Sequence, residues 1–453
     1  MEAATKESRP LFTNQQLCAL IVPLLIEQLL AVAVGMADTM MVSQAGEAAV
    51  SGVSLVDMIN NLIIYLFSAL ATGGAVVTSQ FIGARRIREA GDSAGQLVLL
   101  SLLSGLGILA FCLLCGRPVM RLFFGSITED VMEAGLLYLR ITAVSYPFLA
   151  LYNAGAALFR SVGNSGISMR VSIVMNLINI VGNAIGVLVL HLGVASVALP
   201  TLISRAVAAF LILRAAEHGA GPVQLHLRGL RLRGHMVRRI LEIGVPSAVE
   251  NGLFQLGRLL VVSIIATFGT AQIAANAVAN NLDGMAILGG QALGLATITV
   301  VGQCVGAGDY AQARRYNRKL MLISWLLIAA SVAAILISLP LLLNLYNISD
   351  EARVLSAQLV RLHNIPAIAL WCLSFTLPNT LRAAGDARFT MVVSIVSMAV
   401  FRIGFSVVLG IWMGMGAIGV WIAMDIDWVC RVICFVARYF SGAWTRKYQN
   451  YQA

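Results

Sequence analysis

Carboxylate, amide and hydroxyl side chains occur in otherwise apolar stretches of this sequence. Asp38 lies in an apolar run with no basic residue within one helical turn, and such a carboxylate can bind and release a proton. Asn179 and Asn183 are four residues apart, so they share one face of a helix, and Thr201 follows in the next apolar segment. Their oxygen atoms are also hard ligands suited to Na⁺. These four residues predict a cation-coupling site, although amides and hydroxyls also simply link membrane helices.

Two glutamates follow prolines at the same spacing. Glu27 comes four residues after Pro23, and Glu250 comes four residues after Pro246. A proline inside a helix frees a carbonyl and can kink the helix. We predict a polar substrate or cation site in the second half of the chain, formed by Glu250, Asn251 and Gln255. For Pro23, Glu27 and Pro246 we predict structural or gating roles.

Two arginines precede glycine-containing segments, and a charged pair lies further on. Arg160 and Arg382 are each followed by a glycine three residues later, which is typical of a helix end, with gating as the alternative role. Asp427 and Arg431 are four residues apart, a spacing that favours an ion pair on one helix and neutralises two buried charges. We interpret this pair as structural.

The composition identifies the elements that must carry these residues. The chain has 453 residues, of which 59% are hydrophobic and 11% are charged, and its mean hydropathy is +0.86. Soluble domains are about 45–50% apolar and about 25% charged. The composition therefore excludes a soluble enzyme, a disordered chain and a disulfide scaffold. Long continuous apolar runs predict an all-α polytopic membrane protein and argue against a β-barrel.

We predict twelve transmembrane helices. Their ranges are 15–42, 52–80, 93–116, 134–158, 168–190, 194–215, 239–267, 274–303, 317–343, 358–381, 389–412 and 415–437. The longest polar interruption, residues 216–238, predicts a basic cytoplasmic linker between two six-helix bundles, residues 1–215 and 239–453. The first apolar run has full spanning length and no evident cleavage site, so we expect it to remain as a helix.

The basic residues predict the orientation in the membrane. The formal net charge is +10, and loops on the side of the termini would carry most of the lysines and arginines. The opposite loops would carry only Arg117, Arg121 and Arg353. By the positive-inside rule, both termini are expected in the cytoplasm and the chain in the cell membrane. The lipid bilayer therefore explains the positive charge, and no nucleic-acid partner is expected.

An internal repeat relates the two halves. The displacement that places Pro23 on Pro246 also superposes Glu27, Gln80 and Gly83 on Glu250, Gln303 and Gly306. Shortening this displacement by a single position superposes Arg160 on Arg382. Because the displacement covers six spans, the halves share one orientation and are related by an axis along the membrane normal. Two such bundles are the architecture of an alternating-access transporter.

Several short strings resemble the MATE (multidrug and toxic compound extrusion) family along nearly the whole chain. They are EQLL at 27–30, GMADT at 35–39, SQFIGA at 79–84, GVP at 244–246, GQCVGAG at 302–308 and LRAAGD at 381–386. The resemblance implies export of drugs or metabolites in exchange for H⁺ or Na⁺. It also implies a cation site at Asp38, Asn179, Asn183 and Thr201. NorM-like members carry a second pair, of which Glu250 matches the glutamate, but residues 369–375 offer no acid for the other. The chain therefore resembles DinF-like members more closely.

These observations predict an antiporter for amphipathic, often cationic small molecules, driven by H⁺ with Asp38 as the proton switch. The alternatives are a Na⁺-coupled exporter of the same fold and a flippase for a lipid-linked precursor. The sequence contains no HExxH pair, no GxxxxGK[ST] loop and no nucleophile–base set. We therefore expect no enzymatic activity and no cofactor, and we expect a monomer.

Overall fold

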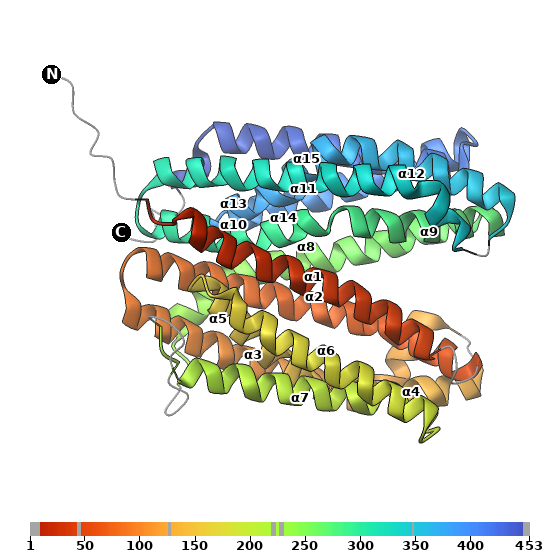
Figure 1. Ribbon diagram of the computed structural model, residues 1–453, viewed down its shortest axis with the longest axis horizontal. Coiled ribbons are helices and arrows are strands. Elements are labelled where there is room, and N and C mark those ends of the chain that lie inside the picture. Colours follow the sequence, from red (N-terminus) through yellow and green to blue (C-terminus); the bar gives the residue numbers. More distant parts are fainter. Residues whose placement is uncertain are drawn as a thin grey trace.

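The protein is a bundle of long helices lying side by side (Figure 1). The computed structural model describes residues 10–42, 47–125, 128–218, 223–225, 231–346 and 348–446, and this part of the chain contains no β-strand. The first seven helices are α1 (Asn14–Val42), α2 (Glu47–Gly83), α3 (Ile87–Phe124), α4 (Glu129–Val144), α5 (Tyr146–Ser161), α6 (Ser165–Leu188) and α7 (Ala195–Glu217). The others are α8 (Gly234–Ala266), α9 (Thr270–Ala286), α10 (Leu288–Gly306), α11 (Tyr310–Asn344), α12 (Asp350–Trp371), the π-helix η2 (Cys372–Thr376), α13 (Leu377–Ala383), α14 (Ala387–Ser397), the π-helices η3 (Met398–Gly404) and η4 (Ser406–Trp412), and α15 (Gly416–Phe440).

The predicted all-helical, multi-span architecture is confirmed. Within the described residues, ten helices are long and apolar enough to cross a membrane, and α4 with α5 makes an eleventh if the bent pair is one span. The helix α15 also has 25 residues, but it carries Asp425, Asp427 and Arg431 near its middle. Each of the twelve predicted spans overlaps one helix or a run of consecutive helices.

Several predicted spans are interrupted rather than continuous. The span predicted at 134–158 bends by 44° between α4 and α5. Pro147 is the second residue of α5 and has no N–H to continue the helical ladder from α4. At the end of α4, Thr142 Oγ1 donates to the carbonyl of Tyr138 at 2.8 Å. The span predicted at 358–381 contains the π-helix η2, which precedes Pro378. Local π-helical turns of this kind often occur at functional sites.

The repeat appears in the helix boundaries. The starts of α2 and α9, at Glu47 and Thr270, are separated by the same displacement as Pro23 and Pro246, and so are the ends of α2 and α10. In Figure 1, α1–α7 form one group of helices and α8–α15 form the other. The division into residues 1–215, 216–238 and 239–453 stays a prediction.

Helices α2 and α10 cross at glycines from equivalent positions of the two repeats. A Cβ on Gly83 would lie 1.9 Å from the carbonyl oxygen of Gln303, and a Cβ on Gly306 would lie 1.9 Å from that of Gln80. No side chain fits at either position, because real Cβ contacts are longer than this by more than 1 Å. We refer to Gln80, Gly83, Gln303 and Gly306 as the α2–α10 crossing.

The two glutamines of the α2–α10 crossing bind helix ends of opposite groups. Gln80 Nε2 donates to the carbonyl of Ala383, the last residue of α13, at 2.8 Å. Gln303 Nε2 donates to the carbonyl of Ser161, the last residue of α5, at 2.7 Å. Carbonyls at a helix C-terminus have no partner within the helix, so each glutamine satisfies one of them across the two groups.

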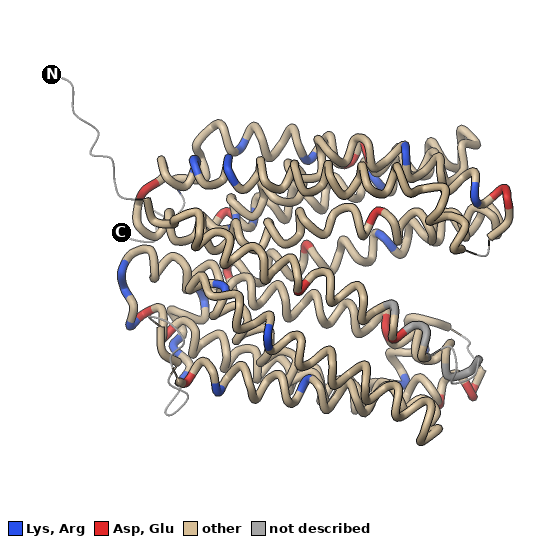
Figure 2. The backbone as a smooth tube through the Cα atoms, in the orientation of Figure 1, with Lys and Arg blue, Asp and Glu red and all other residues tan. Residues whose placement is uncertain are grey.

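The α2–α10 crossing lies at the end of the bundle where the described chain begins and ends. Helix α1 begins and α15 ends at this end (Figure 1). Figure 2 shows lysines and arginines gathered at the same end, whereas the opposite end carries fewer of them. This distribution agrees with the asymmetry on which the predicted orientation rests.

Candidate coupling and substrate sites

The four residues predicted to couple a cation form one hydrogen-bonded chain across α1, α6 and α7. Asn183 Nδ2 donates to Asp38 Oδ1 at 2.7 Å and to Asn179 Oδ1 at 3.3 Å. Asn179 Nδ2 donates to Thr201 Oγ1 at 3.0 Å, and this hydroxyl donates in turn to the carbonyl of Val197 at 2.8 Å. Asn179 and Asn183 are buried, and Asp38 and Thr201 are half-buried.

The chain of hydrogen bonds leaves one acceptor open. Among the described residues, Asn183 Oδ1 has no hydrogen-bond partner although it is buried. The same side chain therefore gives a donor to Asp38 and keeps an oxygen available beside it. A protonated carboxyl needs such an acceptor, and a small cation needs such an oxygen ligand.

A second polar network, not predicted from the sequence, lies between α2, α4 and α5. Asp57 Oδ1 accepts hydrogen bonds from Asn60 Nδ2 at 3.0 Å and from Tyr138 Oη at 3.1 Å. Asn60 Oδ1 accepts one from Tyr146 Oη at 2.6 Å. The available signal was a second carboxylate within an apolar span, with an amide three residues later on the same helical face.

Arg205 of α7 connects the two networks electrostatically. Its Nη1 donates to Ser145 Oγ at 2.7 Å, at the bend between α4 and α5. The guanidinium also interacts with the carboxylates of both Asp38 and Asp57. The two networks thus share one arginine between their two carboxylates, so a change in the charge of Asp38 acts on the arginine that binds Ser145 at the bend.

A cavity of about 660 Å³ lies between the two groups of helices. Its lining residues come from α1, α2, α8, α9, α10, α12, η2, α13, η3 and α15. The predicted residues Glu250, Asn251, Gln255 and Arg382 line it. Asp38, Asn179, Asn183 and Thr201 are not among its described lining residues. Helix α1 nevertheless reaches the cavity through Gln28 and Ala31. The predicted coupling residues and the cavity are therefore separate places joined by one helix.

Glu250 is the centre of a buried ion pair. Its Oε1 lies 2.7 Å from Arg382 Nη2 and accepts a hydrogen bond from Ser394 Oγ at 2.6 Å. Its Oε2 accepts a weaker one from Thr390 Oγ1 at 3.4 Å. Arg382 lies at a helix end as predicted, since α13 ends at Ala383. Its guanidinium neutralises the carboxylate of Glu250. This ion pair was not predicted from the sequence.

Glu27 occupies the equivalent position with a related but weaker set of partners. Its Oε1 accepts a hydrogen bond from Ser168 Oγ at 2.6 Å, and Arg160 acts on it electrostatically. Pro23 lies half-buried one turn earlier in α1, and its counterpart Pro246 is buried in α8. Each glutamate thus lies one turn after a proline within its helix and binds a serine hydroxyl, on the fifth predicted span for Glu27 and on the eleventh for Glu250.

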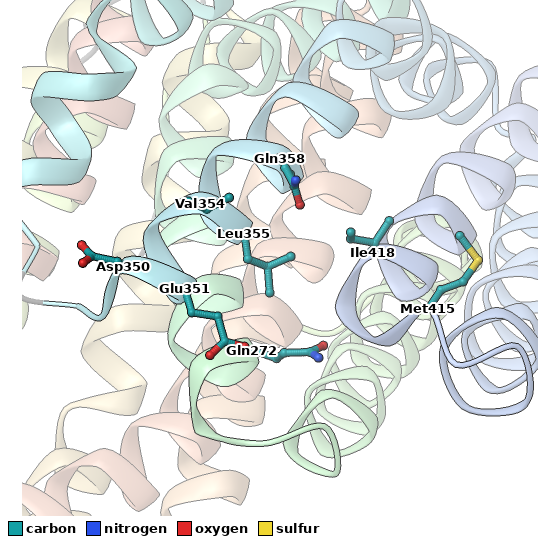
Figure 3. A pocket seen from close by; sticks show the side chains of 8 residues that line it. All are labelled: Gln272, Asp350, Glu351, Val354, Leu355, Gln358, Met415 and Ile418. Atoms are coloured by element: carbon teal, nitrogen blue, oxygen red, sulfur yellow. The ribbon is translucent and has the colours of Figure 1, made fainter.

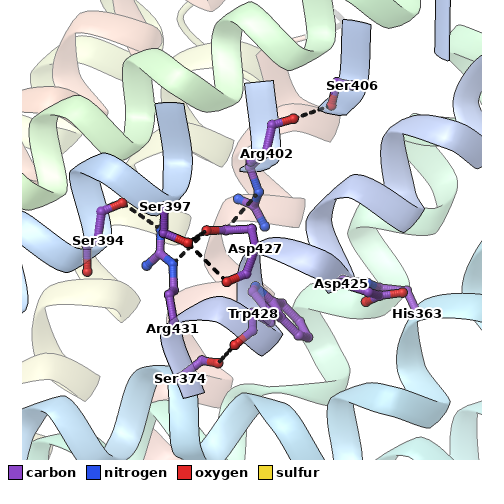
Figure 4. Close-up of polar contacts among 10 residues, drawn as sticks. All are labelled: His363, Ser374, Ser394, Ser397, Arg402, Ser406, Asp425, Asp427, Trp428 and Arg431. Carbon is purple, nitrogen blue, oxygen red and sulfur yellow. Dashed lines mark hydrogen bonds and ion pairs between the residues drawn. The ribbon is translucent and has the colours of Figure 1, made fainter. Parts of the chain in front are cut away.

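Charged residues of the second helix group meet at Asp427 (Figure 4). Arg431 Nε lies 3.0 Å from Asp427 Oδ1, which confirms the predicted pair on one helix. Arg402 Nε lies 3.4 Å from Oδ2, and Ser397 Oγ donates to Oδ1 at 2.5 Å. Both guanidiniums also lie about 5 Å from the ring of Phe254, at 5.1 and 5.3 Å. Two arginines therefore share one carboxylate.

A surface pocket lies at the other end of the bundle, where α9, α12 and α15 begin (Figure 3). It measures about 520 Å³ and contains none of the predicted residues. Two of its polar side chains are engaged locally: Asp350 pairs with Arg353 at 2.8 Å, and Gln272 Oε1 accepts a hydrogen bond from the backbone amide of Ala417 at 2.6 Å. The central cavity is the stronger candidate for a substrate site.

A family model of MatE matches residues 23–185 and 246–408. The chain belongs to the MatE family. The two matches are related by the same displacement that places Pro23 on Pro246, so the predicted internal repeat corresponds to two copies of the MatE unit. MatE proteins are membrane transporters and not enzymes, as the sequence predicted.

Relatives of this MatE chain align with nearly its whole length. It is 28% identical to the "Uncharacterized transporter YisQ" of Bacillus subtilis, over 98% of both chains. It is 23% identical to the "Probable multidrug resistance protein NorM" of Thermotoga maritima, over 96% of this chain and 94% of that one. A solved structure described as the outward-facing conformation of a multidrug resistance MATE family transporter of the MOP superfamily is similar in fold. It has a TM-score of 0.89 and 22% identity and covers 95% of this chain and 96% of that chain.

Proposed function

We propose that this MatE chain is a secondary antiporter that exports amphipathic, often cationic small molecules in exchange for inward H⁺, with Asp38 as the proton switch. The observation that carries the proposal is the hydrogen-bonded chain from Asp38 through Asn183 and Asn179 to Thr201. The name of the Thermotoga relative, a probable multidrug resistance protein, supports the substrate class. Coupling residues in the first half also support the DinF-like assignment.

Protonation of Asp38 changes the hydrogen-bonding group that Asn183 must present to it. The ionised carboxylate accepts the N–H of Asn183, but a protonated carboxyl oxygen becomes a donor and needs an acceptor. The open Oδ1 of Asn183 is that acceptor, and presenting it requires the amide to turn, which breaks the bond to Asn179. Proton binding thus favours a different packing of α1 against α6. Because α1 lines the cavity at Gln28 and Ala31, the repacking reaches the substrate.

The proposed orientation places both termini in the cytoplasm. The α2–α10 crossing then lies on the cytoplasmic side of the cavity, where no side chain fits between the two helices. We infer that this structure is closed toward the cytoplasm. The substrate leaves toward the outside when a proton reaches Asp38 from that side.

Efflux from proteoliposomes tests the proposal. An inward pH gradient and an inward Na⁺ gradient are imposed separately on the wild type, on Asp38→Asn and on the exposed control Asp350→Asn. We expect efflux under the pH gradient alone, loss of efflux in Asp38→Asn and normal efflux in the control. Efflux driven only by Na⁺ would make the four residues a Na⁺ site. Normal efflux by Asp38→Asn under both gradients would refute Asp38 as the switch and direct the test to Glu250.

A second candidate is transport of an anionic amphiphile such as a lipid-linked precursor. Four arginines and two acids line the cavity: Arg258, Arg382, Arg402, Arg431, Glu250 and Asp283. Arg382 is neutralised by Glu250, but Arg258 forms no ion pair with a described residue. An anionic headgroup would complement this excess of positive charge.

Thermal unfolding with added amphiphiles separates the two candidates. A flippase should be stabilised by a lipid pyrophosphate, and Arg258→Gln should abolish that stabilisation. A drug exporter should be stabilised instead by an amphipathic cation such as tetraphenylphosphonium. Arg258→Gln should leave this stabilisation unchanged or increase it.

A further inference from the structure

A buried histidine lies between two carboxylates in the second helix group, away from Asp38. His363 of α12 has no exposed surface. Its Nδ1 lies 2.6 Å from Asp425 Oδ1 of α15 (Figure 4), and its Nε2 lies 3.9 Å from Asp283 Oδ1 of α9. His363 is also the one histidine that falls inside a predicted span, and an ionisable residue at that depth is itself a signal of function.

Two tryptophans hold the imidazole in place. The Trp421 ring meets it edge-on with centroids 5.0 Å apart, and the Trp428 ring lies 4.3 Å away. Trp421 is itself fixed, because its Nε1 donates to Asn276 Oδ1 at 3.0 Å. The ring is enclosed by these indoles, so its two carboxylate neighbours are the polar routes for a proton.

The geometry leaves one hydrogen bond incomplete. A neutral imidazole that donates Nδ1–H to Asp425 presents Nε2 as an acceptor. Nε2 then faces Asp283 Oδ1, which is also an acceptor, and neither atom has a hydrogen-bond partner among the described residues. Buried polar atoms without partners are costly. A proton on Nε2 supplies the missing hydrogen-bond donor. The positively charged imidazole then forms an ion pair with the carboxylate of Asp283.

The surrounding charges favour a proton rather than a metal. Besides the two carboxylates, the groups that act on Asp283 are the guanidiniums of Arg258 of α8 and Arg402 of η3. Helix α11 also packs on α12, but its basic residues all precede Leu320, in its first three turns. No group of three His, Cys, Asp or Glu in the described chain is arranged to hold a metal ion.

Asp283 connects this cluster to the substrate cavity. It lines the cavity together with Trp428 and Met424, the residue before Asp425. A proton can therefore leave Nε2, protonate Asp283 Oδ1 and pass to water in the cavity, with the imidazole returning to its neutral form. A substrate that fills this wall of the cavity competes with that proton for Asp283.

We propose that His363, with Asp283 and Asp425, is a second proton-binding site that takes up and releases one proton in each transport cycle. The proposal rests on the proposed H⁺ antiport and extends it to two protons. The sequence predicted an incomplete second-half cation site because residues 369–375 contain no acid. The structure offers a different group of proton-binding residues. The tenth predicted span contributes His363, and the helices packed beside it contribute the carboxylates Asp283 and Asp425.

Nitrogen NMR of the whole chain, labelled with ¹⁵N-histidine in detergent, tests proton binding without any substrate. His363→Gln assigns the His363 signals among those of the five histidines. Spectra are recorded across the pH range in which the protein stays folded, and we expect the Nε2 signal of the wild type to change from the neutral to the doubly protonated form as the pH falls. Asp283→Asn, which keeps the shape of the wall, should shift this transition. A His363 signal that stays in one form over this range would refute the proposal.

Proton stoichiometry tests the role in transport. Proteoliposomes are held at zero membrane potential with a pH difference of one unit, and the limiting gradient of tetraphenylphosphonium is measured. Two coupled protons sustain a gradient of about 100-fold and one proton sustains about 10-fold. We expect about 100-fold for the wild type and for the exposed control His235→Gln, and about 10-fold for His363→Gln.

The outcomes separate this proposal from the proposed function. A wild type that builds no gradient from a pH difference contradicts the antiport itself. A wild type limited to about 10-fold, or a His363→Gln variant that still reaches about 100-fold, contradicts the second proton site and leaves the antiport intact. If His363→Gln does not fold, Asp283→Asn takes its place with the same expected loss.

Discussion

Alanine at either glycine of the α2–α10 crossing should open the side of the cavity that we propose faces the cytoplasm. The new Cβ of Gly83→Ala or Gly306→Ala would lie 1.9 Å from a backbone oxygen of the facing helix. The obstacle is backbone rather than a flexible side chain, so the two helices must separate by roughly 1 Å, and such overpacking costs about 1–3 kcal/mol. This energy corresponds to a shift of about 5–150-fold in a two-state equilibrium.

The shift can be measured as access to the cavity. Thr72 lines the cavity and precedes Gln80 by eight residues, or about 12 Å along α2. A cysteine at position 72 is exposed to an impermeant methanethiosulfonate reagent from the cytoplasmic face of inside-out vesicles. We expect labelling to be about 5–150-fold faster in Gly83→Ala and in Gly306→Ala than in the parent. The two effects should be similar, because the two glycines have equivalent surroundings.

Gly107 provides a matched control in the same chain. A Cβ there meets no atom within 4 Å, so Gly107→Ala in α3 should leave the labelling rate unchanged. It should also stabilise the helix by about 0.5–1 kcal/mol. An unchanged labelling rate in both crossing variants, in protein that still unfolds cooperatively, would refute the conclusion that the crossing closes this side.

Thermal unfolding in detergent tests three contacts inside the helix groups. Glu250→Gln leaves the charge of Arg382 buried and should cost about 3–5 kcal/mol, whereas replacing both residues with glutamine should cost less. Asp427→Asn leaves two arginines without their shared carboxylate and should cost at least as much as Glu250→Gln. Tyr138→Phe removes one hydrogen bond to Asp57 and should cost about 1 kcal/mol. A wild-type melting temperature in any variant would contradict the contact it removes.

Much of the architecture could be predicted because it depends on local and repeated properties. A membrane helix must contain about 20 apolar residues, so the continuous apolar runs in the sequence located the spans. The repeat was visible because prolines, glutamates and glutamines stood out from an apolar background at one displacement. Helical periodicity placed Asn179 and Asn183 on one face, and the structure brings them to Asp38.

The interruptions of the spans were harder to predict. A hydropathy pattern follows residue type and is insensitive to the direction of the helix axis. The bend at Ser145 and the π-helix η2 therefore look like ordinary apolar segments in the sequence. Proline alone was an ambiguous signal, because Pro23 and Pro246 lie within helices that continue.

The sequence by itself determined that this chain is a duplicated helical membrane protein with buried charges that require partners. Only the tertiary structure decided which residues pair with those charges. Arg382 neutralises Glu250 from a distant part of the chain, and His363 lies between carboxylates of α9 and α15. The physical reason is that a buried charge can be satisfied by any helix that packs beside it, and the choice depends on crossing geometry that no local pattern records.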